Sequence, residues 1–268
     1  MRRRDVVVVK GGGDLATGVA HRLHRAGFRV VITELAQPRV IRRTVAFASA
    51  IYEGQVTVEG VVARQASLGE VVGLLQEGVI PVLIDPAAEA VKVLRPLAVV
   101  DAIMAKRNTG TRMSDAPIVV GLGPGFTAGL DVHAVVETQR GHDLGRVILK
   151  GSAAPDTGVP GAVGGVTTER VLRAPCDGTF RSQRAIGQRV EQGDVVADVD
   201  GVPVVARVGG VLRGLLADGL TVREGMKIGD VDPRGVVEHC FTISDKARAV
   251  GGGVLEAILY LRRHIEET

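Results

Sequence analysis

Aromatic residues are scarce in this sequence, which has no Trp, two Tyr and five Phe among its 268 residues. Proteins that bind single-stranded nucleic acid stack bases on aromatic side chains, and few such side chains are available here. The formal net charge is only +3, and the arginines are scattered rather than clustered. We therefore expect that nucleic acid is not a partner.

Cysteine and long apolar runs are also in short supply. The two cysteines, Cys176 and Cys240, form no CxxC pair, so the pattern provides neither a disulfide framework nor a zinc knuckle. The apolar run Val6–Val9 ends at Lys10 and is much shorter than the core of a signal peptide. No apolar stretch approaches the roughly 20 residues that span a bilayer. The sequence predicts a soluble cytoplasmic protein without a membrane partner.

The N-terminal segment has the pattern of a strand, a helix and a second strand. Val6–Val9 is a β-branched run, residues 14–26 place apolar side chains at helical spacing, and residues 29–33 form a second apolar run. This order predicts a parallel βαβ unit and an α/β fold, with a Rossmann-like N-terminal domain built on a parallel sheet. Weaker patterns predict helices at 39–49 and 67–76 and strands at 80–84, 97–103, 118–121 and 147–149.

An internal repeat follows the Gly- and Pro-rich segment 151–165. Gly178, Arg181, Gly187, Val190 and Gly193 recur 32 residues later as Gly210, Arg213, Gly219, Val222 and Gly225, and Asp198-Val199-Asp200 recurs as Asp230-Val231-Asp232. Short apolar stretches alternate with glycine turns, which indicates a small all-β module. It resembles the barrel-sandwich hybrid fold of biotinyl and lipoyl carrier domains. The junction between the repeats, 200–203, holds no lysine, so we expect no biotin or lipoate.

The last segment has the spacing of a helix from Ser244 to His264, but it contains Gly251, Gly252 and Gly253. Either the helix begins only at Gly253, or the glycines permit close approach of another backbone or a ligand. These patterns predict three regions: a nucleotide- or cofactor-binding α/β domain at 1–165, the β-repeat module at 166–235, and a C-terminal helical segment at 236–268 that packs back on the α/β domain.

The first glycine loop has the spacing of a phosphate-binding turn. Residues 11–16 fit G-x-G-x-x-A between a strand and a helix, which is the required context. We expect binding residues at Gly11, Gly12, Gly13, Asp14, Ala16 and Thr17, with Glu34 accepting hydrogen bonds from ribose hydroxyls. The Asp14 carboxylate counts against a plain dinucleotide site. The alternative is an empty glycine turn in which Asp14 caps the helix.

A second glycine loop, residues 121–126, follows another apolar strand. We expect Gly123, Gly125 and Phe126 to line the same crevice. The alternative is a rigid turn set by Pro124. Lys106, Arg107 and Asn108 are candidate contacts to an anionic ligand, although a solvated surface position is the more common explanation for any one of them. The histidines show no metal-ligand spacing, and we expect no metal site.

Several strings together resemble one family. They are residues 8–18, Thr33-Glu34 with Gln37-Pro38, residues 121–129, residues 136–142, and the ending 244–258. They resemble the YqeB family of accessory proteins of the selenium-dependent molybdenum hydroxylase system. The resemblance implies participation in maturing molybdenum hydroxylases, through handling of the molybdenum cofactor or of labile selenium. It supplies no catalytic residues, because the activity of the family is not assigned.

Three hypotheses follow. In the first, the chain is an accessory factor that binds a nucleotide or a molybdenum-pterin cofactor at the two glycine loops and delivers or modifies it for a hydroxylase apoenzyme. The β module then serves docking or homo-oligomer formation. In the second, it is an NAD(P)-dependent oxidoreductase. In the third, it is a ligand-free chaperone for the hydroxylase. Whether the chain is an enzyme stays open at this point.

Overall fold

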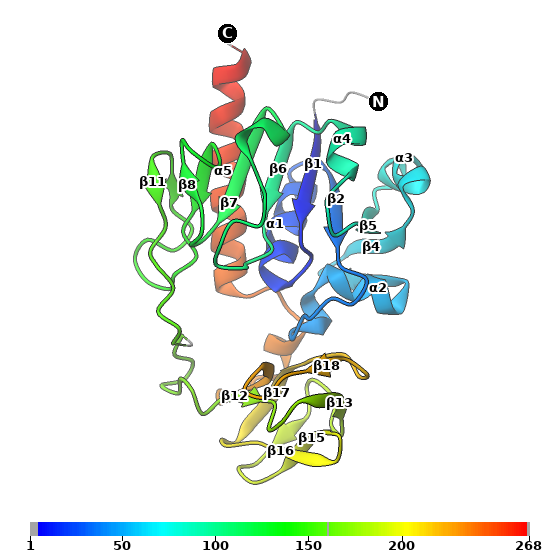
Figure 1. The fold of residues 1–268 in the computed structure, drawn as a ribbon, viewed down its shortest axis with the longest axis vertical. Helices are drawn as coiled ribbons and strands as arrows, with labels where there is room; N and C mark the ends of the chain where they lie inside the picture. Colours follow the sequence, from blue (N-terminus) through cyan, green and yellow to red (C-terminus); the bar gives the residue numbers. More distant parts are fainter. Residues whose placement is uncertain (1–4, 160, 267–268) are drawn as a thin grey trace. The chain divides into compact units, whose positions relative to one another are not determined.

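The computed structural model describes residues 5–159 and 161–266, which divide into two compact units (Figure 1). Unit 1 comprises Met1–Pro38, Phe47–Thr157 and Ile243–Thr268, and unit 2 comprises Arg39–Ala46 and Gly158–Thr242. The division differs from the expected regions at three places. Residues 39–46, 158–165 and 236–242 all belong to unit 2.

Unit 1 is built on a sheet of nine strands in the order β10-β9-β7-β6-β1-β2-β5-β4-β3. The strands are β1 (Val6–Lys10), β2 (Arg29–Glu34), β3 (Gln55–Val58), β4 (Val61–Ala66), β5 (Ile80–Ile84), β6 (Ala98–Asp101), β7 (Ile118–Leu122), β9 (Ala134–Val136) and β10 (Val147–Ile148). A separate two-stranded sheet joins β8 (Thr127–Ala128) to β11 (Gly151–Ser152).

The prediction of a Rossmann-like domain with a parallel sheet is wrong, because the sheet is mixed. The strands from β4 to β9 in the sheet order pair in parallel, but β3 pairs antiparallel with β4 and β10 pairs antiparallel with β9. The β3–β4 hairpin also interrupts the crossover from β2 to β5. Antiparallel strands at the edges of an otherwise parallel sheet are common, and a short apolar run does not reveal its partner's direction.

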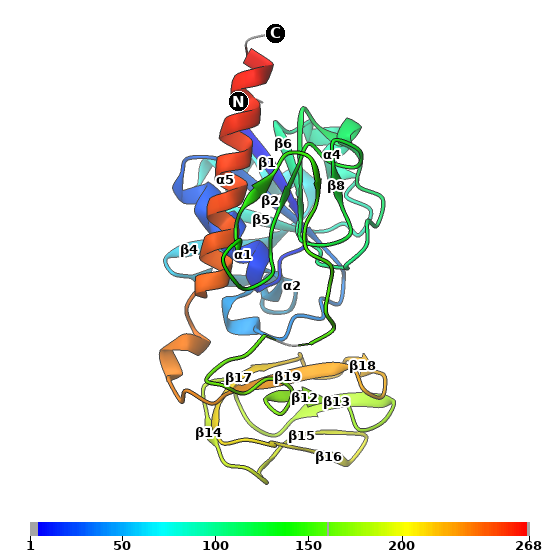
Figure 2. The same cartoon turned by 90° about the vertical axis from the view of Figure 1, so that its left-hand side faces the viewer.

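Helices cover both faces of this sheet. Helices α1 (Asp14–Arg25) and α5 (Asp245–Glu266) pack together on one face (Figures 1 and 2). The other face packs against α3 (Val71–Gln76) and α4 (Ala90–Leu94), with Val6 and Val8 of β1 in that core. The remaining helices of unit 1 are short: α2 (Ala50–Glu53) and the 3-10 turns η3 (Phe47–Ser49), η4 (Leu68–Glu70) and η5 (Met113–Asp115).

The glycines of α5 are explained by helix packing. The helix runs unbroken through them, so it does not begin at Gly253. A Cβ atom on Gly251 would lie 2.7 Å from the carbonyl oxygen of Gly18 in α1, and one on Gly253 would overlap the carbonyl oxygen of Gly145. A Cβ atom on Gly252 would meet no other atom within 4 Å. Two of the three glycines therefore permit close backbone approach, as one of the two sequence interpretations held.

This geometry predicts opposite effects for neighbouring substitutions. Gly252→Ala should raise the free energy of unfolding by about 0.5–1 kcal/mol, because alanine favours the helix and meets no obstacle. Gly251→Ala should lower it by about 1–3 kcal/mol, because the helices must separate. Urea denaturation of both variants measures the difference. Equal effects in the two variants would contradict the packing explanation.

Unit 2 contains two four-stranded antiparallel sheets, ordered β12-β19-β17-β14 and β16-β15-β13-β18. Its strands are β12 (Val171–Arg173), β13 (Gly178–Ser182), β14 (Arg189–Val190), β15 (Val195–Val199), β16 (Val202–Val205), β17 (Gly210–Leu215), β18 (Thr221–Val222) and β19 (Lys227–Asp232). The first repeat copy supplies β12–β15 and the second supplies β16–β19. If each strand is exchanged for the corresponding strand of the other copy, the order of one sheet becomes the order of the other. The two repeat copies thus occupy equivalent positions around one apolar core.

The expected helix at 39–49 is wrong. Residues 43–45 form only the 3-10 turn η2 (Arg43–Val45), and Ile41 accepts a backbone hydrogen bond from Leu215 at 2.9 Å. The segment 39–46 therefore belongs to the β module because it bonds to the end of β17. The 3-10 turn η6 (Val237–Cys240) completes this unit. None of the helices in the described part of the chain is both long and apolar enough to cross a bilayer.

The hairpin that joins the repeat copies turns at Asp200 and Gly201, which have φ angles of 46° and 86°. Two residues with positive φ between paired strands form the tight turn expected in such a hairpin. No lysine stands at this tip. We expect the protein purified from a host with biotin and lipoate ligases to keep its unmodified mass, as measured by intact mass spectrometry. An adduct of either cofactor would contradict this.

Candidate functional site at the carboxyl edge of the sheet

The parallel strands of unit 1 end in a common row. Lys10 is in register with Thr33 of β2 and with Asp101 of β6, and Asp101 is in register with Gly121 of β7. The chain goes from β1 to β2 on one side, whereas β6 lies on the other side of β1. In open α/β sheets, ligands bind outside the carboxyl ends of the strands at such a reversal. The candidate site is therefore the edge formed by β1 and β6.

A buried polar network lies at this edge. The hydroxyl of Thr111 donates a hydrogen bond to Asp101 Oδ2 at 2.6 Å, and Lys10 Nζ donates to the same hydroxyl and lies 3.5 Å from Asp101 Oδ2. Asp101 and Thr111 are almost fully buried. Sequence reasoning did not assign Lys10, Asp101 or Thr111 to the site. For the first two a signal was present, because each is a charged residue that ends a buried apolar strand.

The loop after β6, residues 102–111, has an unusual backbone. Met104 and Lys106 both have φ of 61°, a left-handed conformation that few residues other than glycine adopt. Asn108 fixes the end of the loop: its Oδ1 accepts hydrogen bonds from the amides of Gly110 and Thr111, both at 2.8 Å. Lys106 pairs with Asp156 at 2.6 Å, so this predicted cationic contact already has an acidic partner.

The first glycine loop makes close contacts with its own chain. A Cβ atom on Gly11 would lie 3.1 Å from the carbonyl oxygen of Ala102, and one on Gly12 would lie 2.8 Å from the Ala48 amide nitrogen. Thr17 is fully buried; its hydroxyl donates to Gly12 O at 3.2 Å and accepts from Phe47 N at 2.8 Å. These contacts hold the loop against the 3-10 turn η3, and Ala16 is buried as well.

Gly13 and Asp14, like Gly11, stay half-exposed. Gly13 is the N-cap of α1 and provides no side-chain cap; Asp14 is the first helical residue. Burial lowers the pKa of Lys246 at the start of α5, and the negative charge of Asp14 opposes this shift. The Asp14 carboxylate thus lies close enough to a lysine for their charges to interact, which reduces the repulsion of an anionic ligand.

Glu34 ends β2 beside this loop. Its Oε1 accepts a hydrogen bond from the Gly12 amide at 2.8 Å, and its Oε2 accepts one from the Leu35 amide at 2.7 Å. A carboxylate offers about four acceptor positions, so two remain for hydroxyl groups of a ligand. Two apolar side chains next to Glu34 are exposed: that of Leu35, which follows it in the chain, and that of Ile84, its register partner in β5.

The pKa of Glu34 leads to a prediction about stability. Burial raises the pKa above its ordinary value of 4.5, and the two amide hydrogen bonds oppose the rise. A raised pKa in the folded state stabilises the protein at low pH, and this contribution is lost as pH rises through the folded pKa. The unfolding free energy of wild type relative to Glu34→Gln should therefore fall as the pH rises above the ordinary value of 4.5. Urea denaturation at a series of pH values tests this, and a difference that does not change with pH would contradict it.

The second glycine loop is packed closely into unit 1. Phe126 is buried and lies against Gly121, where its ring occupies the place of a Cβ atom. A Cβ atom on Gly123 would overlap the Thr138 hydroxyl, and one on Gly125 would lie 2.6 Å from the backbone of Arg107. Gly11 and Gly125 therefore contact the loop 102–111 at two places. Of the predicted residues in this second loop, Gly125 is exposed and Gly123 and Phe126 are buried.

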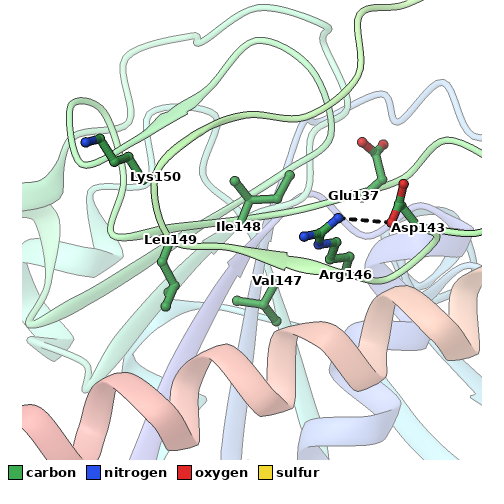
Figure 3. Close-up of a pocket in the computed structure, with 7 residues that line it drawn as sticks. All are labelled: Glu137, Asp143, Arg146, Val147, Ile148, Leu149 and Lys150. Carbon is green, nitrogen blue, oxygen red and sulfur yellow. Dashed lines mark hydrogen bonds and ion pairs between the residues drawn. The ribbon is translucent and has the colours of Figure 1, made fainter.

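A separate cavity of about 350 Å³ lies beside β10 (Figure 3). Its lining residues are Glu137, Asp143, Arg146, Val147, Ile148, Leu149 and Lys150. Glu137 is buried and accepts three backbone amide hydrogen bonds, and Arg146 pairs with Asp143 at 3.1 Å. None of the predicted site residues lines this cavity. Because most of its charged groups are already paired, we place the candidate site at the β1–β6 edge instead.

Within residues 5–159 and 161–266, no group of three or more His, Cys, Asp or Glu side chains is arranged to hold a metal ion.

Comparison with known proteins places the chain near one relative. No family model matches it. It is 54% identical over 257 residues to the uncharacterized protein YqeB of Escherichia coli (strain K12), covering 96% of this chain and 48% of that protein. The chain is thus similar to YqeB over nearly all of its own length. The chain spans about half the length of this relative.

Solved structures give only distant likenesses. An aspartoacylase family protein from Mesorhizobium loti is 10% identical, with 84% of each chain covered and a TM-score of 0.26. A succinylglutamate desuccinylase from Silicibacter sp. TM1040 is 13% identical, with 85% and 84% covered and a TM-score of 0.25. At this level the likenesses carry no argument about function.

Proposed function

We propose that this protein binds a nucleotide or a molybdenum-pterin cofactor at the carboxyl edge of β1 and β6, and that it acts as an accessory factor in the maturation of molybdenum hydroxylases. The observation that carries the binding proposal is the Glu34 carboxylate. It is fixed by the Gly12 and Leu35 amides at the end of β2, the strand next to the β1–β6 pair where the strand order reverses. A rigid acceptor at this place suits hydroxyl groups of a ligand.

The half-exposed residues Gly13 and Asp14 supply the place for a phosphate group. The first amides of a helix have no partner within the helix, and the helix dipole favours an anion there. Gly13 provides no side-chain cap that would compete with a ligand. The apolar side chains of Leu35 and Ile84 offer contact area for a heterocyclic ring.

The client is proposed from the resemblance to the YqeB family. An accessory factor needs to bind its cofactor and release it to a hydroxylase apoenzyme, so the edge should bind reversibly. The β module of unit 2 supplies a further surface for docking to the client or to a second copy.

Thermal unfolding with NAD, NADP, ATP, CTP and a molybdopterin-type cofactor tests the binding proposal. A ligand at about 100 times its dissociation constant should stabilise the protein by roughly 2.7 kcal/mol. Gly13→Val should remove this shift, because the side chain blocks the phosphate. The Gly13 backbone, with φ of −64° and ψ of −177°, accepts valine without strain, so the ligand-free melting temperature of the variant serves as the control.

The outcomes separate the three hypotheses. A shift with one ligand that is lost in Gly13→Val supports binding at this edge. Activation of a purified hydroxylase apoenzyme by the loaded protein, but not by the variant, supports the accessory role. Oxidation of NADH by the protein would favour an oxidoreductase. The absence of any shift, together with unchanged activation by Gly13→Val, would overturn the proposal in favour of a ligand-free chaperone.

A further inference from the structure

We infer that Lys10 recognises a second anionic group of the ligand, across the edge of the sheet from Glu34, and that Asp101 and Thr111 are its positioning residues. The inference rests on the proposed function. It adds a binding residue and a ligand class: a molecule with at least a diphosphate or an equivalent pair of anionic groups.

The strand geometry places Lys10 and Glu34 on opposite faces. Side chains alternate along a strand, and Lys10 is in register with Thr33, one residue before Glu34. Lys10 therefore shares the face of Val6 and Val8, which pack in the core toward α3 and α4. Glu34 takes the opposite face, which α1 covers. A ligand that reaches both residues has to cross the edge between them.

The ammonium group of Lys10 is held in place but not saturated. An ammonium has three N–H donors. In the described part of the chain, Lys10 Nζ has two oxygen neighbours, Thr111 Oγ1 and Asp101 Oδ2. The Lys10 side chain is 11% exposed, whereas that of Asp101 is 2% exposed. One N–H is thus available to a ligand, and Lys10 is the more exposed member of the pair.

A purely structural role explains this arrangement less well. Burying an ion pair costs desolvation energy that apolar residues of similar size avoid, so such a pair is weak evidence of stabilisation. The loop that delivers Thr111 also holds Met104 and Lys106 in a left-handed conformation. Residues held in such conformations cluster at active sites and ligand-binding sites. Both features lie at the reversal of strand order, where ligands bind.

The experiment compares binding of adenosine, AMP, ADP and inorganic pyrophosphate to wild type, Lys10→Met and the double variant Lys10→Met/Asp101→Asn by calorimetry. Lys10→Met alone leaves Asp101 buried without its cation and should lower the melting temperature. The double variant removes both charges and should recover stability. Because the double variant should fold as stably as wild type, a loss of binding in it can be attributed to the missing contact between Lys10 and the ligand.

In wild type we expect ADP to bind more tightly than AMP. In the double variant the affinity for ADP and pyrophosphate should fall about tenfold, the size expected for losing one charged hydrogen bond, while adenosine binding stays unchanged. A structural role for Lys10 would not move the ratio of ADP to adenosine affinity. If wild type binds ADP and the double variant binds it equally well, this inference fails and the proposed function stands. If wild type binds none of these probes or the cofactors of the thermal series, both fail.

Discussion

The hydrogen-bonded register between β1 and β6 is the constraint on which the candidate site depends. It places Lys10 opposite Asp101, and Thr111 then completes the network from the loop that follows. A shift of one residue in this pairing would turn the side chains of one strand to the other face. The charge of Lys10 opposes such a shift, because the shift would carry it into the rows that the fully buried residues Val6–Val9 occupy.

The spacing of apolar residues and glycines was enough to predict the first strand, helix and strand of the chain. The strand Val6–Lys10, helix Asp14–Arg25 and strand Arg29–Glu34 lie within a residue or two of the expected ranges. The mixed sheet could not be predicted, because the direction of β3 and β10 is set by partners rather than by their own residues. Segment 39–46 shows the same limit. Its apolar spacing is helical, but it forms a backbone hydrogen bond with Leu215, far along the chain, instead of a helix.

The site was predictable only in part, because glycine gives the same sequence signal for two different uses. A missing side chain is needed where a ligand approaches and equally where the chain approaches itself. At Gly12 the neighbour is Ala48, and at Gly251 it is Gly18. Glu34 was identified from its place at a strand end, but its hydrogen bonds to Gly12 and Leu35 depend on the fold. Thr111 had no local signal, since its partners are Lys10 and Asp101.

The balance of charge at the edge restricts what can bind there. Glu34 and Asp14 are negative, and a phosphate close to them would be repelled unless a cation offsets the charge. Lys246 is close enough to Asp14 for their charges to interact, while Lys10 lies beyond the edge from Glu34. A small, singly charged anion would gain from only one of these lysines. A longer ligand with hydroxyl groups at Glu34 and phosphates extending toward the lysines satisfies both, which favours a nucleoside diphosphate or a pterin-dinucleotide over a simple anion.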